Sequence, residues 1–220
     1  MKLKIEDLYD LTHTRAAEYL KQFNYPWEAL AGISDLVLTI GKTLSEDEFD
    51  RPAENVWIAK DTKVAPTASI TGPCIIGHNT EVRPGAFIRG SALIGDNCVV
   101  GNSTEIKNVI IFDNVHVPHY NYVGVAILGF HAHMGAGSIT SNVKADNKNV
   151  VVKNEGELLE TGRRKVGAML GDYADIGCGS VLNPGVVIGR HTNVYPLSCV
   201  RGVVPPNCIY KDKDNIVEKY

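Results

Sequence analysis

The chain reads CIIGHNTEVRPGAFIRGSALIGDNCVVG from residue 74 to residue 101. Within this stretch every sixth residue is a branched aliphatic, and the same period continues on both sides of it. The positions of this period are Ile58, Val64, Ile70, Ile76, Val82, Ile88, Ile94, Val100 and Ile106, and later Leu170, Ile176, Leu182, Ile188, Val194 and Val200. A second register lies four residues after the first and holds only small side chains: Thr62, Ala68, Cys74, Thr80, Ala86, Ala92, Cys98 and Thr104.

A period of six excludes an α-helix, because six residues span about 1.67 helical turns and successive members would spiral around the axis. In extended chain, residues i and i+4 point to the same side, so each hexad predicts one short strand and one turn. Three hexads make one coil, and residues eighteen apart then stack in ladders such as Ile58, Ile76 and Ile94. Each buried Ile or Val in such a ladder contributes roughly 1.5–3 kcal/mol. The sequence therefore predicts an all-β solenoid of stacked coils.

The 220 residues predict one main domain with a small extra element. Residues 1–55 have apolar side chains at helical spacings, and Pro26 suits the start of a second helix, so we expect a helical element and linker there. Residues 56–220 form the repeat domain, with a charged loop insertion near 143–168 that we expect over a ligand site. The period slips by one residue after Ile106 and again after Val123, and Pro205-Pro206 is expected to end strand pairing.

The charge and the cysteines exclude several classes of protein. A net charge of −3 argues against non-specific binding to nucleic acid. No stretch is apolar and long enough to cross a membrane, so we expect a cytoplasmic protein without a membrane partner. The five cysteines show no C-x-x-C spacing and are interpreted as free thiols, which leaves no disulfide framework and no zinc site.

Five short motifs follow one another between residues 83 and 148. They are RPGAFIRG (83–90), VGNSTEIKN (100–108), PHYNYVG (118–124), MGAGSITSN (134–142) and NK (147–148). In this order they resemble the C-terminal acetyltransferase domain of bifunctional uridylyltransferase/glucosamine-1-phosphate acetyltransferases. GRRKVGAMLGDYADIG (162–177) and LNPGVVIG (182–189) resemble archaeal sugar-1-phosphate nucleotidylyltransferases.

This resemblance to the hexapeptide-repeat acyltransferases implies a left-handed parallel β-helix, a homotrimer with sites between subunits, and acetyl transfer from acetyl-CoA to the amine of an amino-sugar 1-phosphate. It implies no metal cofactor. The related enzymes carry a glycine-rich nucleotide-binding domain before the repeat, and no such signature precedes it here, so nucleotidyl transfer is not expected.

His119 matches the catalytic base of that family. An amino sugar is largely protonated near neutral pH, and its amine must lose a proton to attack a thioester. An imidazole with its ordinary pKa of about 6.5 can accept that proton, and a positioned base contributes about 10²–10⁴ in rate. The alternative is an ordinary corner histidine.

Sugar and phosphate contacts are expected from the other matching positions. Arg83 and Lys107 would bind the phosphate, since Arg offers a bidentate fork and Lys a point charge. Tyr122, Asn142 and Lys148 match the remaining sugar-phosphate or acyl positions. Each could instead be an ordinary wall, turn or loop residue.

We expect the acyl donor, acetyl-CoA, to lie along a column of small residues. Ala136 and Gly137, with Gly135, would let the chain approach acetyl-CoA closely, and their amides could polarise the thioester carbonyl. Cys178 stands where the related enzymes have a serine, while Arg163 and Arg164 could meet the phosphates of coenzyme A. A tight corner and a solvated basic turn are the alternatives.

Two other functions remain open. Some β-helices are zinc carbonic anhydrases, but the H-x-x-x-x-H pair of that class is absent here. A non-catalytic β-helix could also oligomerise with, or regulate, a separate nucleotidyltransferase.

Overall fold

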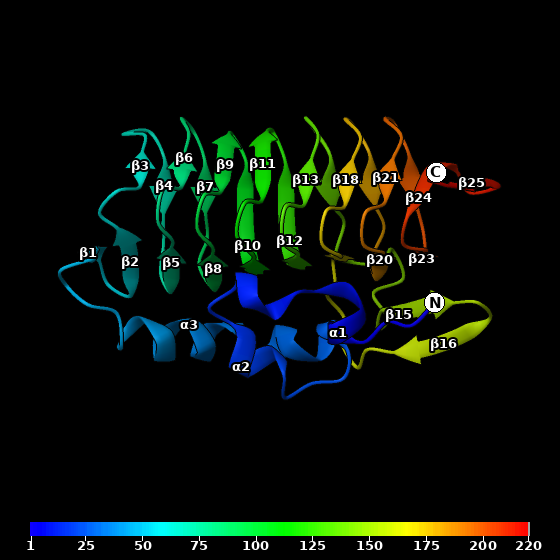
Figure 1. Cartoon of the computed structure of the whole chain (residues 1–220), viewed down its shortest axis with the longest axis horizontal. Helices are drawn as coiled ribbons and strands as arrows, with labels where there is room; N and C mark the ends of the chain where they lie inside the picture. Colours follow the sequence, from blue (N-terminus) through cyan, green and yellow to red (C-terminus); the bar gives the residue numbers. More distant parts are fainter. Residues whose placement is uncertain (220) are drawn as a thin grey trace.

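The computed structural model describes residues 1–219 and has the form of a long stack of short strands with a layer of helices along one side (Figure 1). Each coil gives one strand to each of three parallel faces. Face 1 consists of β3 (Lys63–Val64), β6 (Glu81–Val82), β9 (Val99–Asn102), β11 (His116–His119), β13 (His133–Met134), β18 (Asp175–Ile176), β21 (Asn193–Val194) and β24 (Cys208–Asp212).

Faces 2 and 3 are joined because two long strands run from one onto the other. These are β10 (Glu105–Ile111) and β12 (Tyr122–Leu128). The rest of face 2 consists of β4 (Ser69–Ile70), β7 (Phe87–Ile88), β14 (Ile139–Thr140), β19 (Val181–Leu182) and β22 (Cys199–Val200). The rest of face 3 consists of β2 (Val56–Ala59), β5 (Cys74–Ile76), β8 (Ala92–Ile94), β17 (Ala168–Leu170), β20 (Val186–Ile188) and β23 (Val203–Val204).

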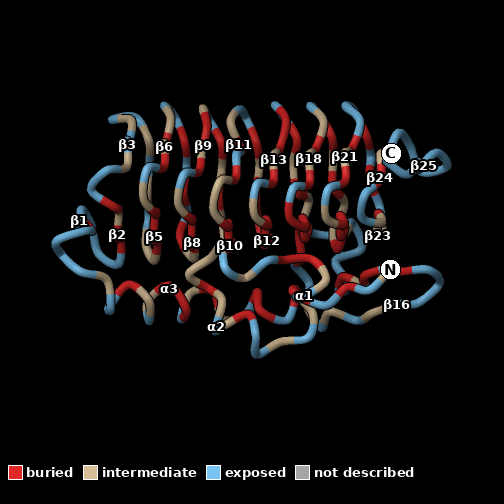
Figure 2. Tube along the Cα trace, viewed as in Figure 1, coloured by how far each residue is buried: buried red, intermediate tan, exposed pale blue. Residues whose placement is uncertain are grey.

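The strand register confirms the predicted ladders. Ile76 pairs with Ile58 on one side and with Ile94 on the other, eighteen residues away in each direction. The aliphatic side chains and the small register behind them fill the interior, which is buried from the second coil onward (Figure 2), whereas Val64 of the first coil is 38% exposed. The fold class is therefore confirmed as a mainly-β parallel solenoid, and its left hand stays a prediction of the resemblance.

The first corner, between faces 1 and 2, is built the same way in six successive coils. One residue of each coil takes a positive φ there: Gly85, Ser103, Tyr120, Gly137, Gly179 and Leu197. In five of the six coils its amide donates to the carbonyl of the preceding corner, as Gly137 N does to His119 O at 2.9 Å, and in the first coil Gly85 N donates instead to Thr67 Oγ1 at 3.3 Å. This ladder keeps residues of successive corners in register, at the interstrand spacing of about 4.8 Å.

The second corner, between faces 2 and 3, collects the irregularities of the repeat. Both predicted slips fall there: β10 and β12 turn the corner as continuous strands, and their coils are one residue short, since Ile94 pairs with Ile111. In the next coil this corner holds the insertion, which carries the antiparallel hairpin β15 (Val151–Asn154) and β16 (Glu157–Glu160). Leu128 consequently pairs with Leu170, 42 residues later.

The N-terminal segment forms short helices packed against face 3. They are α1 (Ile5–Leu8), η1 (Leu11–His13), α2 (Ala17–Leu20), η2 (Pro26–Ala31) and α3 (Ile33–Gly41). Pro26 begins η2 as the sequence suggested, but Gly32 divides the expected second helix into η2 and α3. Trp27, Leu30 and Ile33 are fully or almost fully buried, so this layer covers its own solenoid. No helix within residues 1–219 has both the length and the apolar character needed to span a bilayer.

The third corner, between faces 3 and 1, fastens this layer to the solenoid through Asp172. Its carboxylate accepts the amides of Asp10 (2.7 Å) and Phe130 (2.9 Å) and pairs with Arg190 at 2.6 Å. Burial raises the pKa of Asp172, and these donors and the Arg190 charge oppose the rise. The carboxylate thus joins the helical layer to two coils.

Strand pairing does not end at Pro205-Pro206 as expected. Asn193 of β21 pairs with Ile209 of β24, because the prolines occupy the third corner and leave the next strand free to pair. The two ends of the solenoid are closed by antiparallel strands, β1 (Phe49–Ala53) on β2 and β25 (Asn215–Glu218) on β24.

Candidate functional site at the first corner

His119 ends β11 and stands exposed at the first corner. Its backbone is held by Asn121, whose side chain is only 3% exposed. Asn121 Oδ1 accepts the His119 amide at 3.1 Å, and Asn121 Nδ2 donates to the carbonyls of Gly135 (2.8 Å) and Ser138 (3.1 Å). One buried amide therefore fixes the histidine relative to the corner of the next coil.

The first corner aligns His119 with the predicted donor residues. Gly137 N donates to His119 O at 2.9 Å, and Gly179 N donates to Ala136 O at 2.8 Å. Leu197 N continues the ladder to Cys178 O, also at 2.8 Å. His119, Ala136 and Cys178 thus occupy equivalent positions in successive coils, with Ala136 and Cys178 exposed. A chain-like ligand could lie along this edge.

Two of the three backbone amides expected to polarise a carbonyl already donate hydrogen bonds to other strands. Gly137 N is bonded to His119 O, and Gly135 N donates to Ile176 O at 2.7 Å, because both belong to interstrand ladders. The expectation that all three amides serve an acyl group is therefore wrong for these two. The Ala136 amide has no acceptor among residues 1–219, so it is the donor left for a ligand.

A second group of predicted residues meets on face 2. Asn142 Nδ2 donates to Tyr122 Oη at 3.0 Å. The Tyr122 phenol lies over Gly124, where it leaves no room for a side chain. Lys107 of β10 pairs with Gly124 and so stands beside that phenol. Since Tyr122 follows His119 by three residues, this group begins where the first corner ends.

Arg83 and Lys107 lie on different edges. Val82 pairs with Val100, and Val100 with Val117, so Arg83 stands at the first corner two coils before His119. Its guanidinium pairs with Glu81 at 3.1 Å. The cation that neighbours Lys107 is Arg89, one coil earlier, which pairs with Glu105 at 2.7 Å. Glu105 in turn pairs across the strand with Tyr122, so a charged cluster that the sequence reasoning missed borders the phenol.

Three of the predicted cationic residues lie neither with His119 at the first corner nor with the Tyr122–Asn142 pair on face 2. Lys148 is exposed in the insertion, where its amide donates to Asp146. Arg164 Nη2 donates to Asn147 at 3.4 Å. Arg163 lies toward the helical layer: burial raises the pKa of Tyr19, and the Arg163 charge partly offsets that rise. These positions follow from the course of the insertion, which the sequence pattern does not determine.

Two other lysines lie near the donor edge. A pocket of about 620 Å³ beyond Leu197 is lined in part by Lys211 and Lys213. The sequence reasoning missed them because it ended the solenoid before β24. The only available signal was the run YKDKD after the two prolines.

Among residues 1–219 no group of three or more His, Cys, Asp or Glu side chains is placed to hold a metal ion.

Comparison with known proteins follows the same motifs. The model of the GMPPB C-terminal domain matches residues 70–160. A bifunctional protein GlmU of Methanococcus maripaludis is 36% identical over 122 residues, which are 54% of this chain and 29% of that protein. A bifunctional sugar-1-phosphate nucleotidylyltransferase/acetyltransferase of Sulfurisphaera tokodaii is 35% identical over 97 residues, 44% of this chain and 24% of that protein.

This chain resembles the bifunctional sugar-1-phosphate nucleotidylyltransferase/acetyltransferases. The resemblance predicted from the motifs is thereby confirmed. The chain spans less than a third of the length of the relatives it matches. Among solved structures, a putative acetyltransferase of Bacillus cereus is 19% identical with a TM-score of 0.41, covering 74% of this chain and 77% of that one.

Proposed function

We propose that this protein is an acyl-CoA-dependent N-acetyltransferase that acts on an amino-sugar 1-phosphate resembling glucosamine 1-phosphate. One observation carries the proposal: the exposed imidazole of His119 stands one coil from the free amide of Ala136. A base and a carbonyl-polarising donor on neighbouring coils are what acetyl transfer to an amine requires. The name of the Sulfurisphaera relative, which includes acetyltransferase, supports this choice.

The chain's own residues suffice for the reaction. The ammonium first loses one proton to solvent; His119 then takes a second proton from the amine as the amine nitrogen bonds to the thioester carbonyl carbon. The Ala136 amide donates to the carbonyl oxygen as it becomes negative. When the carbon–sulfur bond breaks, the imidazolium returns its proton to the departing thiolate, so the products are an amide and free coenzyme A.

The acceptor would lie on face 2, beside the Tyr122–Asn142 pair. Tyr122 and Asn142 would orient the sugar hydroxyls, and Lys107 would bind the phosphate. Arg83, at the first corner two coils before His119, is already paired with Glu81 and would reach an acceptor only after that pair opens or from a neighbouring copy.

The donor would follow the first corner away from His119. Its acyl end would rest at Ala136 and its pantetheine arm would pass Cys178. Lys211 and Lys213, in the pocket beyond Leu197, would then meet its phosphates.

The same edge exposes apolar side chains that need a cover. Leu197 is 85% exposed, Tyr120 66% and Phe87 42%. We propose that a second copy of this chain covers them in a homotrimer, since exposed apolar patches mark association surfaces. All five cysteines are free thiols, which fits a reducing compartment such as the cytoplasm.

The test is release of free thiol from acetyl-CoA in the presence of glucosamine 1-phosphate. His119→Ala should lower kcat/KM by about 10²–10⁴. The matched control is His78→Ala, which removes a histidine from a coil away from the site, where it pairs with Asp61. That variant should keep wild-type activity.

Circular dichroism must show that both variants are folded. If the wild-type protein releases no coenzyme A with any amino-sugar phosphate, acetyl transfer to this class is excluded. If His119→Ala and His78→Ala are equally active, His119 is not the base.

A further inference from the structure

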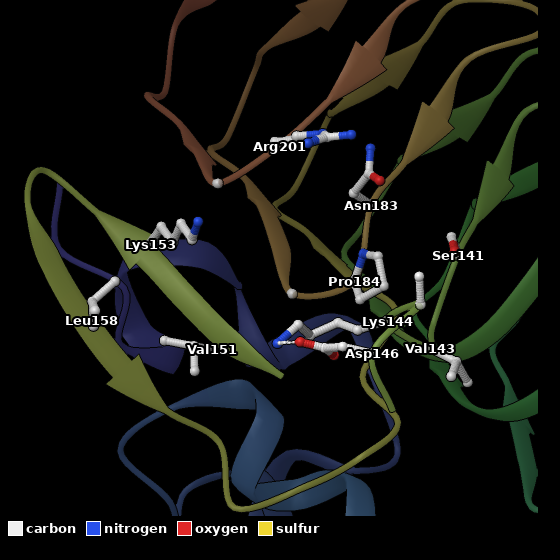
Figure 3. A pocket seen from close by; sticks show the side chains of 13 residues that line it. Ser141, Val143, Lys144, Asp146, Val151, Lys153, Leu158, Asn183, Pro184 and Arg201 are labelled. Atoms are coloured by element: carbon white, nitrogen blue, oxygen red, sulfur yellow. Dashed lines mark ion pairs between the residues drawn. The ribbon is translucent and has the colours of Figure 1, made fainter. Parts of the chain in front are cut away.

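A pocket of about 660 Å³ opens at the second corner, between the β15–β16 hairpin and the end of face 2 (Figure 3). Pockets of roughly 300–1,000 Å³ are typical of small-molecule sites. Ser141, Asn183 and Arg201 line it from equivalent positions in successive coils, just after β14, β19 and β22. None of the residues that the motifs assigned to acetyl transfer lines it, although Arg201 also lines the pocket beyond Leu197 that is proposed for the phosphates of coenzyme A.

The lining carries more positive than negative charge. Lys144, Lys153 and Arg201 face Asp146 alone, and Asp146 is already paired with Lys144 at 3.2 Å. The side chains of Lys153 and Arg201 have no acidic or hydrogen-bonding partner among residues 1–219. Two unneutralised cations in one pocket favour an anionic ligand.

These two cations come from different parts of the chain. Lys153 belongs to β15 of the hairpin, and Arg201 follows β22 of the solenoid wall; Figure 3 shows them approaching the space from two sides. A single phosphate bound by one of them would leave the other unused. A ligand with two linked phosphate groups can meet both, and the Ser141 hydroxyl, unbonded within residues 1–219, adds a donor.

The remaining lining is apolar. Val143, Val151, Leu158 and Pro184 contribute to it, and Leu158 is 66% exposed although it is a large aliphatic. An apolar ledge beside a cationic pair suits a ligand whose phosphates are attached to a flat or hydrophobic group.

We propose that this pocket binds an organic diphosphate, with the diphosphate between Lys153 and Arg201 and the organic group against Val151 and Leu158 of the hairpin (Figure 3). The site is distinct from the first corner and does not depend on acetyl transfer by His119. Because the ligand would touch both the hairpin and the wall, its binding would hold the hairpin against the solenoid.

Calorimetric titration of the full chain tests this with four probes: UDP, dimethylallyl diphosphate, inorganic pyrophosphate and uridine. The three diphosphates should bind and uridine should not; the tighter of the two esters identifies the organic group. Lys153→Gln and Arg201→Gln should each weaken UDP or dimethylallyl diphosphate about tenfold. Hydrogen exchange of residues 151–160 should slow when the ester is bound.

Two controls make the result specific. Lys42→Gln and Lys60→Gln each remove one exposed lysine elsewhere, with the same charge change as each pocket variant, and should bind like wild type. His119→Ala should also bind like wild type, which separates this site from the proposed acetyl-transfer site.

The proposal is overturned if no diphosphate binds at millimolar concentration, or if Lys153→Gln and Arg201→Gln leave affinity unchanged. It is also overturned if Lys153→Gln weakens the binding of coenzyme A as much as that of the probe, since the pocket would then belong to the acyl donor.

Discussion

The first and second corners run along the same coils, yet only the second departs from the repeat. At the first corner, six consecutive coils place one residue at positive φ, and five of them repeat the same amide-to-carbonyl bond. At the second corner, two coils are one residue short and the next carries an insertion. The difference indicates two ways to build a site: a regular edge aligns His119, Ala136 and Cys178, whereas an irregular edge opens a pocket.

Inserting one residue at each corner should reveal the largest difference in stability between them. A glycine inserted after Ser103, at the first corner, should lower the free energy of unfolding by more than about 3 kcal/mol. The reason is that a one-residue slip turns every following side chain to the opposite face unless the corner distorts. A glycine inserted after Asn147, in the insertion of the second corner, should change it by less than about 0.5 kcal/mol.

Urea denaturation of the two insertion variants measures this difference. Equal losses would mean that the first corner is no more constrained than the second.

The next largest effect concerns the side-chain amide of Asn121, which is buried behind the first corner. Asn121→Ala should lower stability by about 1–3 kcal/mol, because it leaves the His119 amide and the Ser138 carbonyl without their partner, while the Gly135 carbonyl keeps its bonds from Ser138. It should also lower kcat, since His119 loses its fixed position. Thr80→Val is the control: Thr80 Oγ1 makes comparable buried bonds with Gly95 O and Cys98 N, but in a coil away from the site.

Both variants are compared by denaturation and by steady-state kinetics under conditions where each is folded. We expect both variants to lose a similar amount of stability, and only Asn121→Ala to lose kcat. A loss of kcat in both would show that Asn121 acts only through stability.

On face 2 the expected effect is smaller. Tyr122→Phe removes the hydroxyl that Asn142 binds and should raise KM for the sugar phosphate about three- to tenfold, which corresponds to about 1 kcal/mol. The value of kcat should change little, because the phenol is proposed to orient the substrate rather than to transfer a proton. A fall in kcat at unchanged KM would instead place Tyr122 in the proton transfer.

The smallest effect is a difference in thiol reactivity. Burial raises the pKa of Cys74 and of Cys98 to about 12, so these interior thiols stay protonated and unreactive at pH 8. Cys178 and Cys199 are exposed and should react with a maleimide in the native protein. Coenzyme A should protect Cys178 and also Cys199, which lines the pocket proposed for its phosphates, as peptide mapping of the labelled protein can determine.

The sequence predicted what periodicity controls. The ladder of Ile58, Ile76 and Ile94, the slips and the insertion were all visible in the spacing, because a buried face imposes its period on the chain. The motifs also anticipated that Tyr122 and Asn142 would meet, although 20 residues separate them.

What the period does not control could not be predicted. Whether the Gly135 and Gly137 amides already donate hydrogen bonds depends on how the strands pair. The direction of Arg163 depends on the path of the insertion. The pocket between Lys153 and Arg201 depends on where the hairpin packs. Asn121 lay between two motif residues, but its role is visible only once the next coil supplies the carbonyls it binds.

The most direct test is a crystal structure of the protein with coenzyme A. The account predicts that the thiol lies beside His119 and the Ala136 amide, that the pantetheine arm passes Cys178, and that the phosphates reach Lys211 and Lys213. Coenzyme A bound at the second corner instead, with its phosphates on Lys153 and the His119 corner empty, would contradict it.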